Sequence, residues 1–271
     1  MENKKVAIIT GASRGIGEYT SVKFAANGYR CTLVGRSKGD LNRVEKSISE
    51  KHGMEVLRCE GDIGDGEFLK EIIRRTIEKW GRIDVLVNNA AWRTIETMRT
   101  ISPDTWNKTI SVCLTAPAFL AKYCAAEMEK LKTGGAIINI SSIMSNRAGG
   151  NSPAYIACKG GIDSLTRELA IAYGRSNIRV IGVNPGYIKT EMSNDYVDSQ
   201  GKNLSAQMSG YIVDATPLGR GGHPEELAEV IYWLSSPAAS FITGTTITAD
   251  GGFSSNLNDY LLKKKQFPQE F

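Results

Sequence analysis

Tyr155 and Lys159 form the most informative pair of reactive side chains in this sequence. On a helix that begins near Pro153, these two residues lie one turn apart and share a face. A free phenol titrates near pH ~10 and is a poor base at neutral pH, but a nearby ammonium favours the phenolate. Such a tyrosine can give a proton to a reduced carbonyl or take one from an alcohol. Ser142, at the end of an apolar run, is placed to hydrogen-bond the same oxygen.

The spacing of this tyrosine and lysine recurs elsewhere, at Tyr19 with Lys23 and at Tyr260 with Lys264. Only Tyr155 has a serine at the end of a strand-length apolar run thirteen residues upstream. In parallel sheets, ligands bind at the carboxyl ends of strands, where such a serine would lie. The predicted catalytic residues are therefore Ser142, Tyr155 and Lys159.

A glycine-rich turn follows the first apolar run and leads into a helical pattern. It reads Thr10-Gly11-Ala12-Ser13-Arg14-Gly15-Ile16-Gly17. Glycines let the backbone turn tightly and approach a pyrophosphate, and the N-terminus of the helix offers free N–H groups to the phosphates. The turn therefore predicts a dinucleotide cofactor. The residues expected to bind it here are Gly11, Ser13, Arg14, Gly15, Ile16 and Gly17.

The charge at the end of the second strand indicates which nicotinamide cofactor binds. NAD sites place Asp or Glu about 20 residues beyond the glycines, where the carboxylate holds the ribose 2′-hydroxyl. This position reads Gly35-Arg36-Ser37 and has no carboxylate. A guanidinium fork is well shaped for a phosphate, so Arg36 and Arg14 could clamp the 2′-phosphate. We therefore predict NADP(H), with Arg36 and Ser37 among the residues that bind it.

Strands and helices in alternation are needed to bring these residues together. Strand-length apolar runs occur at Val6–Ile9, Cys31–Val34, Met54–Leu57, Val85–Val87, Ala136–Ile140, Val180–Val183 and Thr245–Thr248. Helical patterns lie between them, with Asp65 and Ser152 as expected N-caps, Pro153 as a first helical residue and Gly53 as a stop. The runs alternate little between polar and apolar residues, which is typical of parallel strands covered on both faces. The pattern predicts an α/β fold, with one doubly wound (Rossmann) parallel sheet of about seven strands and helices on both faces.

The composition excludes several other classes of protein. Hydrophobic residues make up 41% of the 271, enough for a sizeable core, and the formal charge of +4 comes from interleaved charges without a basic stripe for nucleic acid. Five cysteines without a CxxC exclude a disulfide scaffold, and only two histidines exclude a His-rich metal site. No apolar run approaches the ~18 residues of a membrane span, and the N-terminus lacks a signal-peptide pattern. We expect a cytoplasmic protein that binds neither metal, membrane nor nucleic acid.

Further motifs follow in order along the chain. They are Asp62-Ile63, Asn88-Asn89-Ala90-Ala91, Pro185-Gly186-Tyr187-Ile188-Lys189-Thr190 and Asp250-Gly251-Gly252. Together with the glycine-rich turn, Ser142 and Tyr155-x-x-x-Lys159, they make residues 5–252 similar to the short-chain dehydrogenase/reductase family. The resemblance implies hydride transfer between the nicotinamide and a carbonyl or alcohol carbon, with Lys159 also holding the nicotinamide ribose. It adds to the expected cofactor-binding residues Asp62, Ile63, Asn89, Ala90, Tyr155, Lys159, Pro185, Gly186, Ile188 and Thr190.

One position departs from the family pattern. The family usually has Asn within V-N-L on the helix after the fourth strand, where it helps order a water in a proton relay to the lysine. This sequence reads Val112-Cys113-Leu114, and Cys is a poorer hydrogen-bonding group. Either the backbone carbonyl at 113 still holds the water or the relay is weakened. A thiol with a function of its own is the third alternative, although buried cysteines are usually inert packing.

Residues 190–216 are polar and rich in Gly, Ser and Asn, and we predict that they form a mobile lid over the substrate. The lid offers Asn194, Asp195, Asp198, Gln200, Asn203 and Gln207, and the flanking segments add Trp92, Arg93, Asn146, Arg147 and Asn151. These side chains favour a polar substrate, such as a sugar or sugar acid. The alternatives are a 3-oxoacyl-carrier-protein reductase and a non-catalytic NADP-binding regulator.

The resemblance also implies a homodimer or homotetramer, because helices in the 103–131 and 153–173 regions form two-fold interfaces in the family. We expect one oxidoreductase domain over residues 1–252 and a tail over residues 253–271. The tail carries Lys263–Lys265 and the apolar residues Tyr260, Leu261, Leu262, Phe267 and Phe271. We expect these apolar side chains to pack on a neighbouring subunit.

Overall fold

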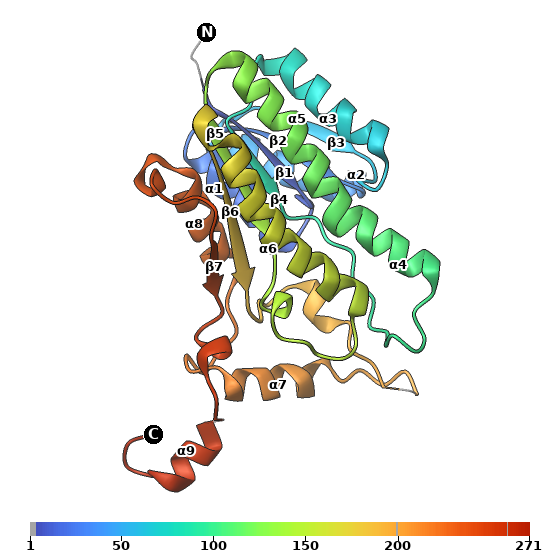
Figure 1. Cartoon of the computed structure of the whole chain (residues 1–271), viewed down its shortest axis with the longest axis vertical. Coiled ribbons are helices and arrows are strands. Elements are labelled where there is room, and N and C mark those ends of the chain that lie inside the picture. The colour runs from blue at the N-terminus through green and yellow to red at the C-terminus, as the bar shows by residue number, and fades with distance from the viewer. Residues whose placement is uncertain (1–3, 199, 259) are drawn as a thin grey trace.

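Seven parallel strands form one sheet within residues 4–198, 200–258 and 260–271, the part of the chain that this computed structural model describes (Figure 1). The strands are β1 (Val6–Thr10), β2 (Arg30–Gly35), β3 (Val56–Glu60), β4 (Val85–Asn88), β5 (Gly135–Ile140), β6 (Ile178–Pro185) and β7 (Thr246–Ala249). Their order across the sheet is β3-β2-β1-β4-β5-β6-β7, so the chain winds outward from β1 in one direction and from β4 in the other. The predicted doubly wound fold is confirmed.

The third strand lies further along the chain than the run predicted at 54–57. It pairs with β2 along Val56–Glu60 at the edge of the sheet. Arg58 and Glu60 are exposed there, so the second half of the strand has no continuous apolar run. The predicted boundaries were wrong because an edge strand is only partly covered.

Helices cover both faces of the sheet (Figure 1). On one face lie α1 (Gly15–Ala26), α2 (Lys38–His52) and α8 (Pro224–Ser235), and on the other α3 (Gly66–Trp80), α5 (Ala116–Leu131) and α6 (Pro153–Tyr173), with α4 (Pro103–Ile110) packed on α6. Successive side chains of β1 pack on opposite faces of the sheet. Ala7 and Ile9 pack in the cluster that contains Phe24, and Ile8 packs in the cluster that contains Ile72. This two-sided burial explains why all five residues of β1 are buried.

Two of the three predicted helix ends have the expected hydrogen bonds. Asp65 Oδ1 accepts the N–H of Glu67 at 2.9 Å, and Gly53, with a left-handed φ of +61°, ends α2. The prediction that the Ser152 side chain caps α6 with a hydrogen bond is wrong. Ser152 occupies the cap position of α6, but its hydroxyl donates toward the carbonyl oxygens of Asn151 at 2.7 Å and Thr94 at 3.1 Å. The side chain is turned toward the loop after β4 and ties that loop to α6.

Helices α4 and α5 join through a π-helical turn at Ser111–Thr115. The resulting stretch, Pro103–Leu131, is the one helix in the described ranges that is long and apolar enough to cross a membrane by length and composition. Half of its most apolar window is buried inside the fold, where α5 packs against α3 and β4. This packing accounts for its apolar composition.

Two segments lie beyond the carboxyl ends of the strands. Residues 190–216 contain a short turn at Glu191–Asn194 and helix α7 (Ser205–Ala215), which crosses below the sheet in Figure 1. The C-terminal segment contains α9 (Tyr260–Gln266), which is set apart from the sheet, and continues to Phe271. The ring of Tyr260 packs edge-on against Phe271 at 6.4 Å between centroids, whereas Leu261 is exposed.

Candidate active site

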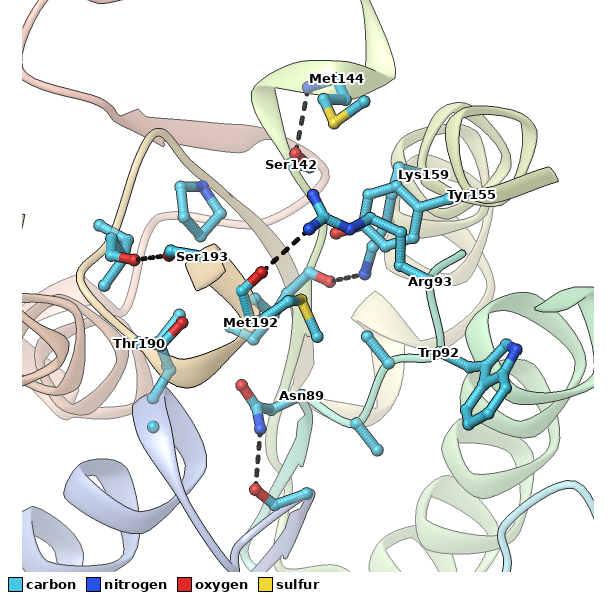
Figure 2. A pocket seen from close by; sticks show the side chains of 18 of the residues that line it. Asn89, Trp92, Arg93, Ser142, Met144, Tyr155, Lys159, Thr190, Met192 and Ser193 are labelled. Carbon is cyan, nitrogen blue, oxygen red and sulfur yellow. Dashed lines mark hydrogen bonds between the residues drawn. The ribbon is translucent and has the colours of Figure 1, made fainter. Parts of the chain in front are cut away.

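Ser142, Tyr155 and Lys159 line one cavity at the carboxyl end of β5. Ser142 stands just after the strand, and the start of α6 carries the other two residues, of which 9% (Tyr155) and 3% (Lys159) is exposed. Lys159 Nζ lies 5.3 Å from the centroid of the Tyr155 ring. It also donates a hydrogen bond of 2.6 Å to the carbonyl of Ile140 (Figure 2). This bond fixes the ammonium beside the phenol.

The backbone orients the hydroxyl of Ser142. Its Oγ accepts the N–H of Met144 at 3.1 Å (Figure 2), and its own N–H donates to Asn184 Oδ1 at 3.1 Å. A hydroxyl has one hydrogen and two lone pairs, so accepting from Met144 leaves the hydrogen free for a substrate oxygen. Asn184 is not among the predicted site residues. Its only signal in the sequence is a polar residue near the end of an otherwise apolar strand.

The glycine positions of the glycine-rich turn do not accept side chains. Gly11 and Gly15 have left-handed φ values of +65° and +54°, and a Cβ at Gly17 would lie 2.1 Å from the carbonyl oxygen of Gly11. Residues 13–16, where α1 begins, line the cavity. The unpaired N–H groups and positive dipole end of a helix N-terminus favour phosphate. The turn from Thr10 to Gly17, called the glycine cradle below, fits the pyrophosphate of a dinucleotide.

Asn89, at the end of β4, braces the turn from the opposite side. Its Nδ2 donates to the carbonyl oxygen of Gly11 at 3.3 Å (Figure 2) and to that of Thr10 at 2.9 Å. Thr10 Oγ1 in turn accepts the N–H groups of Asn89 at 2.9 Å and Ala90 at 3.0 Å. The side chain of Asn89 therefore holds the shape of the cradle.

Arg36 follows β2 and forms no ion pair with any of the described carboxylates. The nearby Asp62 carboxylate pairs with Lys108 at 2.5 Å. Burial alone would raise the pKa of Asp62, but hydrogen bonds from Lys108 and from the N–H of Gly64, together with the charges of Lys108 and, to a smaller extent, Arg36, lower it overall. The Asp62 carboxylate is therefore charged and engaged at neutral pH. The Arg36 guanidinium stays available to an anion in the cavity.

The cavity has a volume of about 620 Å³ and collects most of the predicted site. The predicted residues that line it are Gly11, Ser13, Arg14, Gly15, Ile16, Arg36, Asp62, Ile63, Asn89, Ala90, Ser142, Tyr155, Lys159, Pro185, Gly186, Ile188 and Thr190. Gly17 and Ser37, which were also predicted to bind the cofactor, do not line the cavity. Gly17 allows α1 to pack on the turn, and the Oγ of Ser37 caps α2 by accepting the N–H of Asp40 at 3.3 Å.

The six polar residues of the lid that were predicted to face the substrate are not among the described residues that line the cavity. Apolar, aromatic and polar side chains of the lid line the cavity together: Met192, Tyr196, Met208, Tyr211 and Ile212 beside Thr190, Glu191, Ser193 and Ser209. Asp198 instead accepts the N–H groups of Gln200 and Lys202, and Asn203 accepts that of Ser205. These polar side chains build the turns of the lid. Of the flanking residues, Asn146 also lies outside the cavity, whereas Trp92, Arg93, Arg147 and Asn151 line it.

Arg93 connects the loop after β4 to the lid. It donates to the carbonyl of Met192 at 3.0 Å (Figure 2), to Asp195 Oδ1 at 2.5 Å and to the hydroxyl of Tyr196 at 3.3 Å. Burial alone would lower the pKa of Arg93, but the hydrogen bond and charge of Asp195, together with Tyr196, raise it overall. The guanidinium therefore stays charged, and it ties the lid to the loop that follows the Asn89 motif.

Cys113 lies in the π-helical turn and is almost fully buried. Its Sγ accepts the N–H of Trp92 at 3.2 Å and lies 3.3 Å from the Trp92 carbonyl oxygen, to which the thiol donates. The side chain that replaces the family's asparagine thus holds the main chain of Trp92. Single π turns often occur at functional sites.

The other cysteines are free and buried. Burial raises the pKa of Cys59 to about 11 and that of Cys158 to about 12. Both are thiols at neutral pH and are poor nucleophiles. No group of three His, Cys, Asp or Glu side chains that could hold a metal ion occurs in the described ranges.

The segment after β7 closes one wall of the cavity, because Phe253 lines it. Arg147, from the loop after β5, donates to the carbonyl oxygens of Phe253 at 3.2 Å and Ser254 at 2.9 Å. Its guanidinium also lies 5.2 Å from the centroid of the Phe253 ring. The first residues of the expected tail therefore contribute to the site.

Comparison with known proteins gives matches along nearly the whole chain. A family model described as Enoyl-(Acyl carrier protein) reductase matches residues 11–254. The protein named Short chain dehydrogenase/reductase astE, from Aspergillus oryzae, is 35% identical over 254 residues, which are 92% of this chain and 95% of that protein. The 3-oxoacyl-[acyl-carrier-protein] reductase FabG of Thermotoga maritima is 33% identical over 248 residues, 92% and 97% of the two chains. The crystal structure of L-sorbose reductase from Gluconobacter frateurii, complexed with NADPH and L-sorbose, is similar with a TM-score of 0.87 and 29% identity, covering 94% and 98%.

Proposed function

Because this chain belongs to the short-chain dehydrogenase/reductase family, whose members are oxidoreductases acting on alcohol and ketone groups, we propose that it uses NADP(H) to interconvert a small ketone or aldehyde and its alcohol. The observation that carries the proposal is the shared cavity. It holds the glycine cradle, the Arg36 guanidinium, which forms no ion pair with a described carboxylate, and the group formed by Ser142, Tyr155 and Lys159. The cradle would hold the pyrophosphate and Arg36 the 2′-phosphate.

The residues of this chain supply the proton and the placement of the substrate. A bound nicotinamide supplies or accepts the hydride. The Tyr155 hydroxyl gives its proton to the substrate oxygen during reduction and takes one back during oxidation. Ser142 donates its free O–H to the same oxygen and stabilises the negative charge that develops there. The ammonium of Lys159, held on the Ile140 carbonyl, favours the phenolate that remains.

The direct test is oxidation of NADPH and of NADH with a panel of ketones, aldoses, uronates and acetoacetyl thioesters. We expect at least one compound to be reduced, with NADPH preferred at least tenfold over NADH. Turnover of acetoacetyl thioesters alone would identify a 3-oxoacyl-carrier-protein reductase, as in the Thermotoga relative. Tight binding of NADPH without turnover on any compound would favour the non-catalytic regulator.

For the substrate we propose a small hydroxylated ketone with an apolar face. L-sorbose reductase, a structural neighbour, binds a sugar, which supports a polar substrate. The methionine and tyrosine side chains of the lid favour an apolar part as well. Small ketones with a ring or short alkyl chain therefore belong in the panel beside the sugars and sugar acids.

Arg36→Asp is expected to shift the cofactor preference toward NADH by at least tenfold, which corresponds to about 1.4 kcal/mol. The substitution removes the proposed 2′-phosphate clamp and installs a carboxylate that can accept the ribose hydroxyl. Dissociation constants for NADPH and NADH, measured by fluorescence titration, give the ratio. An unchanged affinity for NADPH would contradict the role of Arg36.

We further propose a cytoplasmic homodimer or homotetramer, in which α9 packs on a neighbouring subunit. Buried free thiols are in keeping with a reducing compartment, and the exposed Leu261 and Phe267 in or near α9 suit an apolar contact.

Deleting residues 257–271 keeps Phe253 and also Asn256, which donates to the carbonyl of Ala215. We expect this truncation to lower the mass in solution or weaken the oligomer on dilution, with NADPH binding unchanged. Light scattering over a range of concentrations measures this, and an unchanged mass would show that the tail is dispensable for assembly.

A further inference from the structure

Trp92 lies beside Arg36 in the cavity. The guanidinium carbon of Arg36 is 5.3 Å from the centroid of the Trp92 ring, and both residues line the cavity. We propose that Trp92 is a positioning residue that holds Arg36 ready for the 2′-phosphate and so strengthens the preference for NADP(H) over NAD(H). This inference rests on the proposed function, in which Arg36 binds that phosphate.

The stacking geometry suits such a role because it uses a different part of the guanidinium from the phosphate. A guanidinium is attracted to an aromatic ring through its face, whereas its N–H donors point outward in its plane. Arg36 can therefore rest on the indole and still present a fork of donors to an anion. Without the ring, the exposed Arg36 side chain would sample many rotamers, and phosphate binding would have to order them.

The ring is itself held in place from the main chain. The N–H and carbonyl of Trp92 are both engaged by the buried thiol of Cys113, at 3.2 and 3.3 Å. The next residue, Arg93, is anchored on Met192 and Asp195 of the lid. In Figure 2 the side chains of Trp92 and Arg93 point in different directions from the chain. The indole is therefore carried on a segment fixed at two consecutive residues.

The indole N–H does not explain why a tryptophan stands here. Trp92 Nε1 is buried and has no hydrogen-bond partner in the described ranges, so the ring face is the feature in contact with a charge. Asp62, the acidic residue close to Arg36, is engaged by Lys108. Trp92→Phe therefore keeps a ring face and breaks no hydrogen bond, which makes it the conservative partner of Trp92→Leu.

The test measures binding of two small probes by calorimetry. Adenosine 2′,5′-bisphosphate and adenosine 5′-monophosphate differ only in the 2′-phosphate. For Trp92→Leu we expect about threefold to tenfold weaker binding of the bisphosphate, in keeping with a cation–π contact, and less than a twofold change for the monophosphate. Trp92→Phe is expected to recover most of the loss. In an Arg36→Ala background, Trp92→Leu is expected to have no further effect on the bisphosphate.

Equal weakening of both probes by Trp92→Leu would overturn the inference, since Trp92 would then be only a wall of the adenosine site. No change for either probe would overturn it as well, and so would a loss for the bisphosphate that persists without Arg36. The proposed cofactor preference is judged separately by Arg36→Ala in the presence of Trp92. If that variant binds both probes like the parent, the assignment of the 2′-phosphate to Arg36 fails, whatever Trp92 does.

Discussion

Turnover of Tyr155→Phe is expected to fall at least a hundredfold, the lower range for loss of a general acid. The substitution deletes only the hydroxyl, so the ring keeps its place beside Lys159 and in the core around α6. We therefore expect the melting temperature and the dissociation constant for NADPH to change little. Steady-state kinetics in both directions, with NADPH binding measured on the same preparation, separate a chemical defect from a folding defect.

Tyr19→Phe is a matched control for this experiment. Tyr19 stands at the same spacing from a lysine, Lys23, but on α1, and it does not line the cavity. We expect this variant to keep the parent rate. If Tyr155→Phe retained more than a tenth of the parent turnover, Tyr155 would not be the proton donor.

Gly17→Ala is expected to weaken binding of NADPH at least tenfold and to lower the melting temperature. The added methyl group would lie 2.1 Å from the carbonyl oxygen of Gly11 and 2.6 Å from the side-chain nitrogen of Asn89. One of these elements must move, and such overpacking typically costs about 1–3 kcal/mol. The movement distorts the turn that Asn89 braces. Calorimetric titration with NADPH and thermal unfolding of the free protein measure the two effects.

Gly39→Ala provides the comparison, since a Cβ at Gly39 in α2 meets no atom within 4 Å. Alanine is the better helix former by about 0.5–1 kcal/mol, so this variant is expected to unfold at the same or a slightly higher temperature. NADPH affinity is expected to be unchanged. If the two variants bound NADPH equally well, close packing at Gly17 would not be needed for the cradle.

The sheet was predictable because its central strands are buried on both faces and leave continuous apolar runs, as in β1. The edge strand β3 was misplaced because three of its five residues face solvent or lie only partly covered. Part of the site was predictable because its residues lie close together in the sequence. Tyr155 and Lys159 share one helix, and Gly11 and Gly15 belong to one short turn. In these cases local geometry alone decides which side chains come together.

Contacts between distant segments were not predictable in the same way. Arg36 and Trp92 are joined only by the fold, as are Arg93 and Asp195, and Ser142 and Asn184. The lid shows the limit most clearly. Its polar residues suggested a polar lining, but irregular turns have no period from which to tell which side chains face the cavity. Asp198 and Asn203 satisfy the backbone of the turns instead, and Asp195 pairs with Arg93.

The strand order also determines when the candidate active site can form as the chain leaves the ribosome. β1 pairs with β2 and β4, so half of the sheet can assemble once residue 88 has been made. Each later strand adds to the edge left by the one before it, β5 to β4, β6 to β5 and β7 to β6. Because Asn184 of β6 holds Ser142, this serine reaches its position in the candidate active site only after the sixth strand has docked. A nascent chain that stops earlier exposes an unpaired strand edge, which makes it a substrate for chaperones or a seed for aggregation.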